Sequence, residues 1–362
     1  MKKYLILSVI GFSFAFVLTA CLHSSPKVHG DPIVYEISYQ TPGTEGAMVE
    51  ASGIIMVPQS GTGPFPMLSC QHGTIFDRHV APSYTDSCPE AKAWLSELAA
   101  KGYLVVMADY IGLGRSGKDF HPYFHAQTEA TAARDMIRAA RKYCHEHGIL
   151  LSNKLFLAGY SQGGHVTAAL QRLLQTDHQS EFTITASAIM AAPFDLSMLF
   201  SHHVSNPGTI SSAVTSLMVT TFNRIYTINP GCRDLLRRPW DSTIPALLDF
   251  NHPEAEVITT LNASPSDIFQ SGFLAGFNAG THPFNLALEK NQVYDWRPQV
   301  PTLLVFSMAD EVVPYTIENK AYARWLELGG KVDSVNLGNV YNHGEGFIPA
   351  LMKAKEWFDK FR

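Results

Sequence analysis

The stretch LFLAGYSQGGHVTAAL, residues 155–170, joins two different patterns of apolar residues at a serine. Residues 155–158 are all apolar, as in a short buried strand, and from Val166 onwards apolar residues recur at the spacing of a helix with one buried face. A chain that turns from strand to helix within a few residues has a strained backbone at the corner and needs small residues on either side. Gly159 and Gly163 occupy those positions, so the G-x-S-x-G pattern predicts that Ser161 projects from the edge of a sheet.

The composition is that of a folded globular protein with a leader. Of 362 residues, 46% are hydrophobic and 16% are charged, a charged fraction below the usual quarter. Residues 1–20 contain two lysines, then an apolar stretch shorter than a membrane span, then small residues. This order is typical of a secretory signal peptide, so the protein is predicted to be exported.

The end of this leader, LTAC at residues 18–21, resembles the bacterial lipoprotein box. In that pattern Cys21 is lipidated and becomes the first residue of the mature chain, and the acyl chains hold the protein at a cell-envelope membrane. The polar residues 21–31 would then form a short tether. Ordinary cleavage near Ala20, with Cys21 left as a thiol, is the alternative.

The charge balance gives no sign of a nucleic-acid partner. Removal of residues 1–20 deletes two lysines from the 27 basic residues and leaves 25 against 32 acidic residues, a net charge of −7. No segment concentrates lysine and arginine as nucleic-acid binding requires. Export permits disulfides, and the four cysteines besides Cys21 allow three pairings or none, so we predict no particular bridge. These four are Cys70, Cys88, Cys144 and Cys232.

Strands alternate with helices along most of the chain. Eight strands are predicted, at residues 33–40, 49–57, 67–71, 103–109, 155–160, 185–191, 302–308 and 332–337. Five helices are predicted, at residues 90–100, 126–147, 163–176, 316–328 and 347–361. The first two strands alternate in polarity like an antiparallel hairpin, and the later ones are continuously apolar, as in a buried parallel sheet. The order therefore predicts an α/β fold with a mostly parallel, doubly wound sheet.

One interval interrupts this alternation. About a hundred residues separate the sixth and seventh strands, far more than a connection between neighbouring elements uses. We interpret residues 196–298 as a helical cap over the site, between core segments 32–195 and 299–362; helices that simply pack on the sheet are the alternative. The apolar cap residues suggest either an acyl pocket or the core of the cap itself. They are Leu217, Met218, Phe222, Phe269, Phe273, Leu274 and Phe277.

A serine hydroxyl becomes a nucleophile only when a base takes its proton and a third group orients that base. Asp310 follows the seventh predicted strand, and His343 lies on the loop before the last helix. The chain order Ser161, Asp310, His343 is the order that an α/β-hydrolase requires, so these three are the predicted catalytic residues. Glu311 and Asp109 are competing candidates for the acid.

Attack on a carbonyl also requires fixed N–H donors for the developing negative charge. The backbone N–H of Gln162 lies at the start of the helix after Ser161, where the helix dipole helps. The second donor is expected from the turn SCQHGT at residues 69–74; we predict the backbone of Thr74, with Gly73 as the competitor. Gln71 and His72 are expected to support this turn.

No metal site is predicted. His121 and His125 stand four residues apart, and His202 and His203 are adjacent, but no acid or cysteine completes a metal-binding pattern. Phosphate-cradling and dinucleotide-binding motifs are also absent from the sequence.

Several segments together resemble the secretory lipase family and its bacterial esterase relatives. Beside the GYSQGG elbow, they are QHGT at 71–74, DYIGLGRS at 109–116, HPYFHA at 121–126 and AARDMIRAAR at 132–141. The resemblance covers residues 32–193 and residues 298–362. It implies an α/β-hydrolase fold with a helical cap inserted after the sixth strand, a serine nucleophile and no cofactor. Carried over to this chain, it implies Ser161, Asp310 and His343 as the triad, with Gln162 and Thr74 as the N–H donors.

Together these patterns predict an exported serine esterase or lipase that acts on a small-molecule or lipid ester. A serine peptidase or an acyltransferase on the same scaffold is the alternative. A non-catalytic lipoprotein that binds ligands through its cap is a third, weaker hypothesis, because a pure binding protein has no need for an ordered triad.

Overall fold

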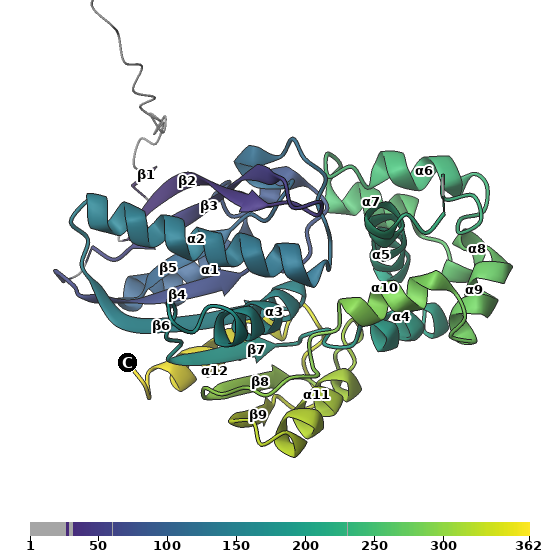
Figure 1. Cartoon of the computed structure of the whole chain (residues 1–362). Coiled ribbons are helices and arrows are strands. Elements are labelled where there is room, and N and C mark those ends of the chain that lie inside the picture. The colour runs from purple at the N-terminus through teal and green to yellow at the C-terminus, as the bar shows by residue number, and fades with distance from the viewer. Residues whose placement is uncertain (1–26, 29–31, 60, 230) are drawn as a thin grey trace, which may run out of the picture.

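The computed structural model describes residues 27–28, 32–59, 61–229 and 231–362 (Figure 1). Within these ranges the strands form a single sheet of nine, in the order β1-β2-β3-β5-β4-β6-β7-β8-β9. The predicted signal peptide and Cys21 lie outside the described residues, as does most of the predicted tether.

All eight predicted strands are present, each with ends within a few residues of the prediction, and a two-residue strand precedes them. The strands are β1 (Lys27–Val28), β2 (Ile33–Pro42), β3 (Met48–Val57), β4 (Phe65–Gln71), β5 (Leu104–Ala108), β6 (Leu151–Tyr160), β7 (Ala186–Met190), β8 (Thr302–Phe306) and β9 (Val332–Asn336). The five predicted helices are α1 (Pro89–Glu97), α2 (Ala126–Glu146), α3 (Gln162–Thr176), α11 (Tyr315–Glu327) and α12 (Phe347–Phe358). Three short 3₁₀ helices are η1 (Arg78–Val80), η2 (Ala99–Lys101) and η3 (Gly114–Ser116).

The pairing of the strands agrees with their polarity patterns. Strands β2 and β3 form the predicted antiparallel hairpin, and β3 pairs antiparallel with β5. From β5 through β4, β6, β7 and β8 to β9, every neighbouring pair is parallel. The carboxyl ends of these six strands therefore lie along one edge of the sheet, which is where α/β proteins place their ligand sites.

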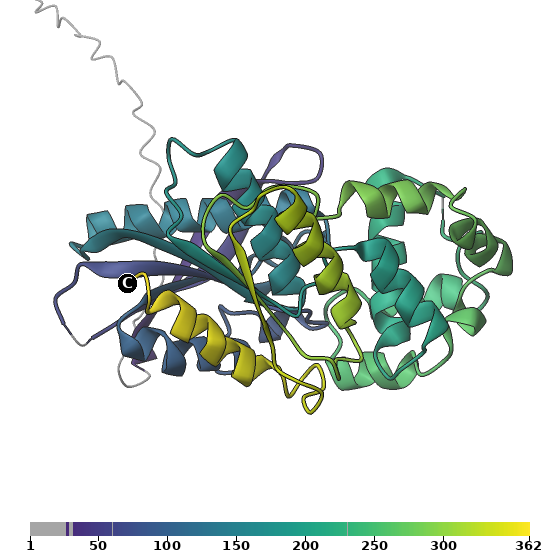
Figure 2. The same cartoon turned by 90° about the horizontal axis from the view of Figure 1, so that it is seen from below.

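Helices cover both faces of the sheet, because the side chains of each central strand alternate between two cores. On β6, Leu157 packs in a core shared with α2 and α3, whereas its neighbours Phe156 and Ala158 pack in a second core with α1 and α12. Figure 2 shows the C-terminal helix α12, in yellow, on the face opposite α2. The predicted doubly wound α/β sheet is confirmed.

The interval between β7 and β8 folds into seven helices at the carboxyl edge of the sheet (Figure 1). They are α4 (Leu196–Ser205), α5 (Ser211–Tyr226), α6 (Trp240–Leu247), α7 (Glu254–Thr260), α8 (Pro265–Ile268), α9 (Ser271–Asn278) and α10 (Pro283–Lys290). We call this group of helices the cap. Its buried side chains continue the core between the sheet and helices α2 and α3, and in this part of the core the Phe200 ring lies 4.8 Å from that of Phe277 and 5.0 Å from that of Phe284.

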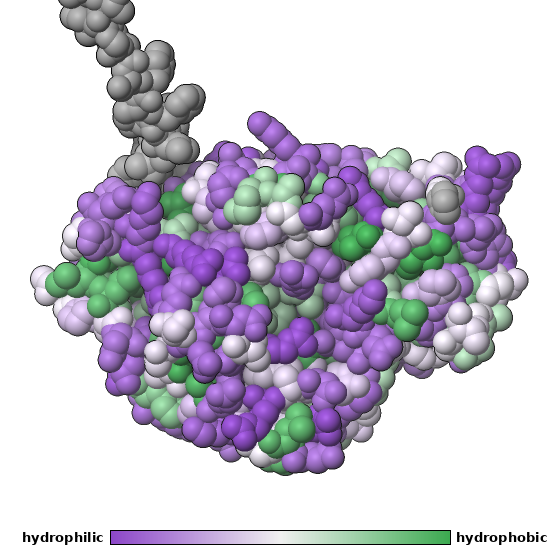
Figure 3. Space-filling model, in the orientation of Figure 1, coloured by the Kyte–Doolittle hydropathy of each residue, from purple (hydrophilic) through white to green (hydrophobic). Residues whose placement is uncertain are grey.

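The apolar residues of the cap that suggested an acyl pocket belong to this core instead. Phe222 and Phe269 are fully buried, and Phe273 packs edge-on against Phe269 with ring centroids 5.6 Å apart. None of the seven lines the pocket described below. Burial inside the cap also explains why only small groups of apolar side chains are visible on the face shown in Figure 3.

The four cysteines that the structure describes are free thiols, of which Cys70, Cys88 and Cys144 are buried. In the described ranges, no helix is both long and apolar enough to cross a membrane.

Candidate active site

Ser161 occupies the corner between β6 and α3 in a strained conformation. Its φ of 59° and ψ of −124° lie outside the regions that residues with a side chain usually adopt. The backbone N–H of Ser161 donates to the carbonyl oxygen of Met190 on β7, at 3.0 Å. The corner thus lifts the hydroxyl above the carboxyl edge of the sheet, as the sequence pattern predicts.

The glycines around this corner are required by close backbone contacts. A Cβ on Gly163 would lie 2.0 Å from the carbonyl oxygen of Gln71, and one on Gly159 would lie 2.1 Å from the carbonyl oxygen of Gly163. Both obstacles are backbone atoms of buried elements, so neither can move aside as a flexible side chain could. The strand, the helix and the turn after β4 can approach this closely only when glycine occupies both positions.

We expect Gly163→Ala to lower the free energy of unfolding by about 3 kcal/mol or more, because overpacking against backbone cannot relax. Urea denaturation followed by circular dichroism measures this. Gly272→Ala is the matched control, because a Cβ there meets nothing within 4 Å. The control should leave stability unchanged or raise it by up to about 1 kcal/mol. Equal stability of the two variants would contradict the packing argument.

The structure brings the three predicted catalytic residues into one hydrogen-bonded line. The Nε2 of His343 lies 2.9 Å from the Oγ of Ser161, and its Nδ1 lies 2.7 Å from the Oδ2 of Asp310. An ionised carboxylate only accepts, so the His343 Nδ1–H donates to Asp310 and Nε2 is left to accept the Ser161 proton. Asp310 follows β8 and His343 follows β9, so the order of the parallel strands creates the line.

Neighbouring groups hold both partners of Ser161 in position. The Oδ1 of Asp310 accepts the backbone N–H groups of Val312, at 2.9 Å, and Val313, at 2.7 Å, which directs Oδ2 toward the histidine. The Tyr160 hydroxyl donates to the His343 carbonyl oxygen at 2.6 Å. Backbone contacts thus orient the carboxylate and the loop that carries the imidazole.

The two competing acids are engaged elsewhere. Glu311 accepts the backbone N–H of His343 at 3.0 Å rather than its ring. Asp109 accepts the Ser52 hydroxyl at 2.6 Å and the Ser83 backbone N–H at 2.7 Å, beneath the turn that follows β5. Burial raises the pKa of the Asp109 carboxyl to about 6. The geometry therefore favours Asp310 as the partner of His343.

The turn after β4 presents one free N–H near Ser161. The Gly73 N–H donates to the Oε1 of Glu90 at 3.0 Å, whereas the Thr74 N–H has no hydrogen-bond partner in the part of the chain that the structure describes. Gln162 is the first residue of α3, so its N–H has no acceptor within the helix. These contacts favour Thr74 over Gly73 as the second donor. The Thr74 hydroxyl lies 2.9 Å from that of Tyr123, which helps to hold the turn.

The sequence reasoning missed Glu90, although this residue connects α1 to the turn that carries Thr74. Besides accepting from Gly73, its carboxyl has a second oxygen, Oε2, that is buried and has no hydrogen-bond partner among the described residues. Burial raises the pKa of Glu90 to about 7, and the Gly73 hydrogen bond opposes this rise. A buried carboxyl beside the nucleophile had no signal in the sequence, because its position depends on how α1 packs.

This raised pKa predicts that the effect of Glu90→Gln on the stability of the protein depends on pH. Between the usual pKa of 4.5 and about 7, the folded state keeps the Glu90 proton and the unfolded state loses it, so the wild type loses stability as the pH rises through this range. The glutamine variant does not titrate and still offers an oxygen to Gly73. We expect its melting temperature, relative to wild type, to rise between pH 5 and pH 8. Glu97→Gln on the same helix is the control, and an equal rise there would contradict the assignment.

Glu129 and His165, also missed by sequence reasoning, form a buried network beneath the corner. Glu129 Oε1 accepts the Gln162 side-chain amide at 2.8 Å, and its Oε2 lies 3.0 Å from the Nδ1 of His165. The Nε2 of His165 lies 2.8 Å from the carbonyl oxygen of Asn291, directly after α10. These contacts join α2, α3 and the segment that follows α10, and so fix the start of α3 and its free N–H.

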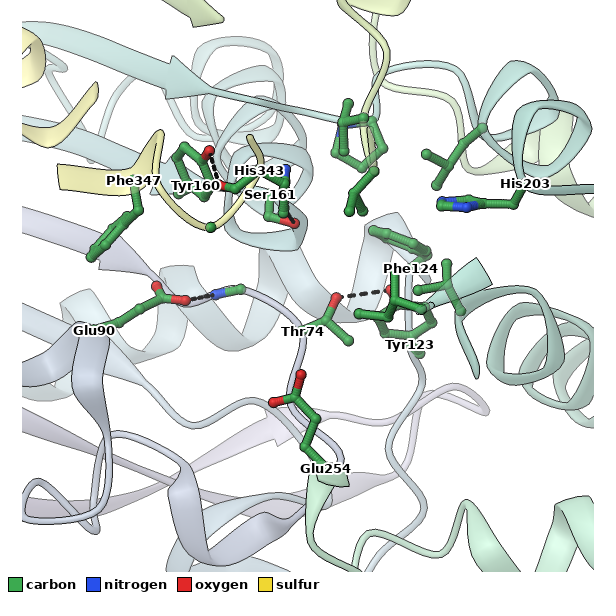
Figure 4. Close-up of a pocket in the computed structure, with 18 residues that line it drawn as sticks. Thr74, Glu90, Tyr123, Phe124, Tyr160, Ser161, His203, Glu254, His343 and Phe347 are labelled. Carbon is green, nitrogen blue, oxygen red and sulfur yellow. Dashed lines mark hydrogen bonds between the residues drawn. The ribbon is translucent and has the colours of Figure 1, made fainter. Parts of the chain in front are cut away.

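Ser161, His343 and Thr74 face a pocket of about 260 Å³ between the sheet edge and the cap (Figure 4). Most of its wall is apolar. The apolar lining side chains are Phe124, Pro193, Leu199, Ile210, Val214, Val312, Val313 and Phe347. Cap helices α4 and α5 supply part of this wall, together with His203, and Glu254 lies at the start of α7. The arrangement can hold an apolar group against an activated hydroxyl.

Neither pair of histidines resembles a metal site. The Nδ1 of His121 lies 2.9 Å from the Ile111 carbonyl oxygen, and the Nε2 of His202 lies 3.0 Å from the Glu311 carbonyl oxygen. Across the described ranges, no group of three or more potential ligands is close enough to hold a metal ion.

Comparison with known proteins identifies a family and several similar structures. A family model described as secretory lipase matches residues 85–360. The structure is similar to that of the rice cell wall degrading esterase LipA from Xanthomonas oryzae, with a TM-score of 0.82 and 30% sequence identity over 92% of this chain and 94% of that chain. A search of curated proteins gave no match.

Two further solved structures share the architecture. One is from Legionella pneumophila, with a TM-score of 0.86 and 28% identity over 93% of this chain and 91% of that chain. The other is lipase A of Candida antarctica, with a TM-score of 0.70 and 19% identity over 91% of this chain and 78% of that chain; at this identity the likeness shows the fold alone.

Proposed function

This chain belongs to the secretory lipase family, and on that premise we propose that it is a serine carboxylic-ester hydrolase that acts through an acyl-enzyme on Ser161. The observation that carries the proposal is the line from Ser161 Oγ through His343 to Asp310, with distances of 2.9 and 2.7 Å, at an apolar pocket. Family membership supports the lipase or esterase class, and the geometry of the site supports the residue roles and the reaction steps.

In the first half-reaction, Ser161 Oγ attacks the ester carbonyl carbon while His343 Nε2 takes the serine proton. The carbonyl oxygen becomes an oxyanion, and the backbone N–H groups of Thr74 and Gln162 stabilise it. When the intermediate collapses, the bond to the alcohol oxygen breaks and His343 donates its proton to that oxygen. The alcohol leaves, and the acyl group stays bound to Ser161.

In the second half-reaction, a water molecule replaces the alcohol. His343 removes a proton from the water as its oxygen attacks the acyl carbon, and then returns that proton to Ser161 Oγ as the acyl–serine bond breaks. The products are a carboxylic acid and the free enzyme. Asp310 remains ionised throughout and stabilises the imidazolium ion that forms twice.

The test is turnover of a series of p-nitrophenyl esters from acetate to palmitate, together with a p-nitroanilide of matched acyl length. Rates that fall beyond short chains would indicate an esterase whose pocket limits chain length. Rates that rise with chain length would indicate a lipase whose cap opens. Faster hydrolysis of the anilide would favour a peptidase, and transfer to an added alcohol acceptor would favour an acyltransferase. No turnover of any ester would favour a binding lipoprotein.

We further propose that residues 196–298 act as the cap that controls access to the pocket. Leu199 and Val214 of this segment line the pocket that contains Ser161. The core would then comprise residues 32–195 and 299–362, preceded by the tether at 21–31 and the signal peptide at 1–20. The secretory family supports export in general, and the leader sequence supports it for this chain.

Anchoring through Cys21 is a separate proposal that rests on the LTAC pattern. In a bacterial host fed an alkyne fatty acid, we expect the wild-type chain to be labelled and to sediment with the membrane fraction. Cys21→Ser should abolish the label and release the protein, because no acyl chain is attached. Cys232→Ser, at a half-buried thiol, is the control and should stay labelled. Equal labelling of Cys21→Ser and wild type would contradict lipidation at Cys21.

A further inference from the structure

His203 is a buried polar residue in the apolar wall of the pocket. It lies on cap helix α4, its side chain is almost fully buried, and its ring points into the pocket near Phe124 (Figure 4). The Nδ1 of the ring lies 2.9 Å from the Ser211 Oγ at the start of α5. The other ring nitrogen, Nε2, is buried and has no partner of good hydrogen-bond geometry in the described part of the chain; the Val312 backbone interacts only weakly with the ring. A buried polar atom without a partner suggests that a ligand provides one.

The surroundings of Ser211 indicate which ring nitrogen carries the proton. The Ser211 Oγ accepts the backbone N–H of Gly208 at 2.8 Å, and we assign its own proton to the hydrogen bond with the His203 Nδ1. A neutral imidazole has one N–H, and an Nδ1 that accepts leaves this proton on Nε2. His203 therefore presents an N–H donor to the pocket.

This donor is neutral in the working pH range of a serine hydrolase. Burial lowers the pKa of His203 to about 4; the nearby His202 and His343 lower it further, and Asp310 and the Val312 carbonyl oppose the shift. The carboxyl groups that line the same pocket belong to Glu90 and Glu254, and no lysine or arginine is among the lining residues. The pocket thus offers a hydrogen bond but no positive charge for a carboxylate.

We propose that His203 determines substrate specificity by donating a hydrogen bond from Nε2 to an uncharged oxygen in the acyl chain of the ester. The preferred substrates would be esters of oxygen-substituted acids, with an ether, hydroxyl or keto oxygen in the acyl chain, rather than esters of plain alkanoic acids. This inference rests on the proposed function. It follows from a buried N–H donor that lies in the wall among apolar side chains such as Leu199 and Val214.

The experiment compares pairs of p-nitrophenyl esters of equal chain length, in which one methylene is replaced by an ether oxygen. The measured quantity is the ratio of kcat/KM for the ether ester to kcat/KM for the alkyl ester. This ratio is divided by the ratio of the two esters' hydrolysis rates with hydroxide, which corrects for the difference in their intrinsic chemical reactivity. For the wild type we expect a normalised ratio above one. In His203→Leu the ratio should fall about tenfold, since the hydrogen bond is lost and the donor is removed. A ratio that stays the same would overturn the proposal.

Two variants separate specificity from folding. His202→Leu makes the same change one residue away, outside the pocket lining, and should leave the ratio unchanged; an equal fall there would overturn the proposal. His203→Gln retains an N–H donor and should restore part of the ratio. If His203→Leu does not fold, Ser211→Ala serves instead, because it frees the His203 ring to adopt the other tautomer. Ser211→Ala should lower the normalised ratio about two- to threefold. An unchanged ratio in this variant would overturn the proposal.

Further outcomes distinguish this inference from the proposed function. An ester with a terminal carboxylate should be a poor substrate, and its preference over the ether ester would overturn the choice of an uncharged oxygen. Ser161→Ala should abolish turnover of both members of each pair. Full activity in that variant would refute the proposed function, whereas Ser161-dependent activity with no preference for the ether ester would refute only the role of His203.

Discussion

Replacement of Ser161 by alanine is expected to reduce kcat for p-nitrophenyl butyrate by a factor on the order of 10⁴ or more. The variant keeps the pocket and the N–H groups of Thr74 and Gln162 but lacks the oxygen that bonds to the carbonyl carbon. Water would have to attack directly, without the acyl-enzyme that divides the reaction into two easier steps. The remaining rate would reflect binding and oxyanion stabilisation alone.

Stopped-flow or steady-state release of p-nitrophenol measures this effect, and labelling with a fluorophosphonate followed by mass spectrometry identifies the modified residue. Ser201→Ala is the matched control, because Ser201 is exposed on cap helix α4. The control should retain full activity and full labelling. Activity within tenfold of wild type in Ser161→Ala, or a label on another residue, would rule out Ser161 as the nucleophile.

Asp310→Asn is expected to lower kcat about 10⁴-fold, through the wrong tautomer of His343 rather than through misfolding. The backbone N–H groups of Val312 and Val313 both donate to Asp310 Oδ1, so the amide of an asparagine would place its oxygen there. Its NH₂ group would then face His343 Nδ1 and donate to it. The imidazole would carry its proton on Nε2, which could no longer accept the proton of Ser161.

Glu311→Gln is the matched control for this prediction, since it makes the same chemical change at the adjacent acid. The glutamine oxygen can still accept the His343 backbone N–H that Glu311 accepts at 3.0 Å, so activity should stay within tenfold of wild type. Comparison of kcat for the two variants, with thermal melting to establish that both fold, decides the assignment. A larger loss in Glu311→Gln than in Asp310→Asn would identify the wrong acid.

Much of the architecture could be predicted because its signals are local. The apolar run of β6, the glycines around Ser161 and the helical spacing of α3 lie within 26 consecutive residues, so strand, corner and helix can be recognised without knowledge of the rest of the fold. The continuous apolar run of β5 and the mostly apolar run of β7 indicate burial on both faces, and hence a parallel sheet with helices on either side. In such a sheet the residues after successive strands share one edge, which explains why chain order alone placed Ser161, Asp310 and His343 together.

The choice between two adjacent candidate residues, in contrast, could not be settled by local sequence signals. Asp310 and Glu311 are adjacent in sequence, yet one accepts from the imidazole and the other from the backbone of the same histidine. Gly73 and Thr74 are likewise adjacent, and only the packing of Glu90 against the turn shows which N–H is free. The direction of a side chain or an N–H on a loop depends on the atoms packed around that loop, which the residue type does not specify.

The sequence by itself determined the α/β fold, the strand-to-helix corner at Ser161 and the set of residues from which a triad could be formed, because these depend on periodicity and on steric limits within short segments. Only the tertiary structure decided that the apolar cap residues pack in a core continuous with that of the sheet, that Glu129 and His165 support the corner and that His203 faces the pocket. Each of these contacts joins segments distant along the chain, and its energy depends on packing and hydrogen bonds that exist only once those segments meet.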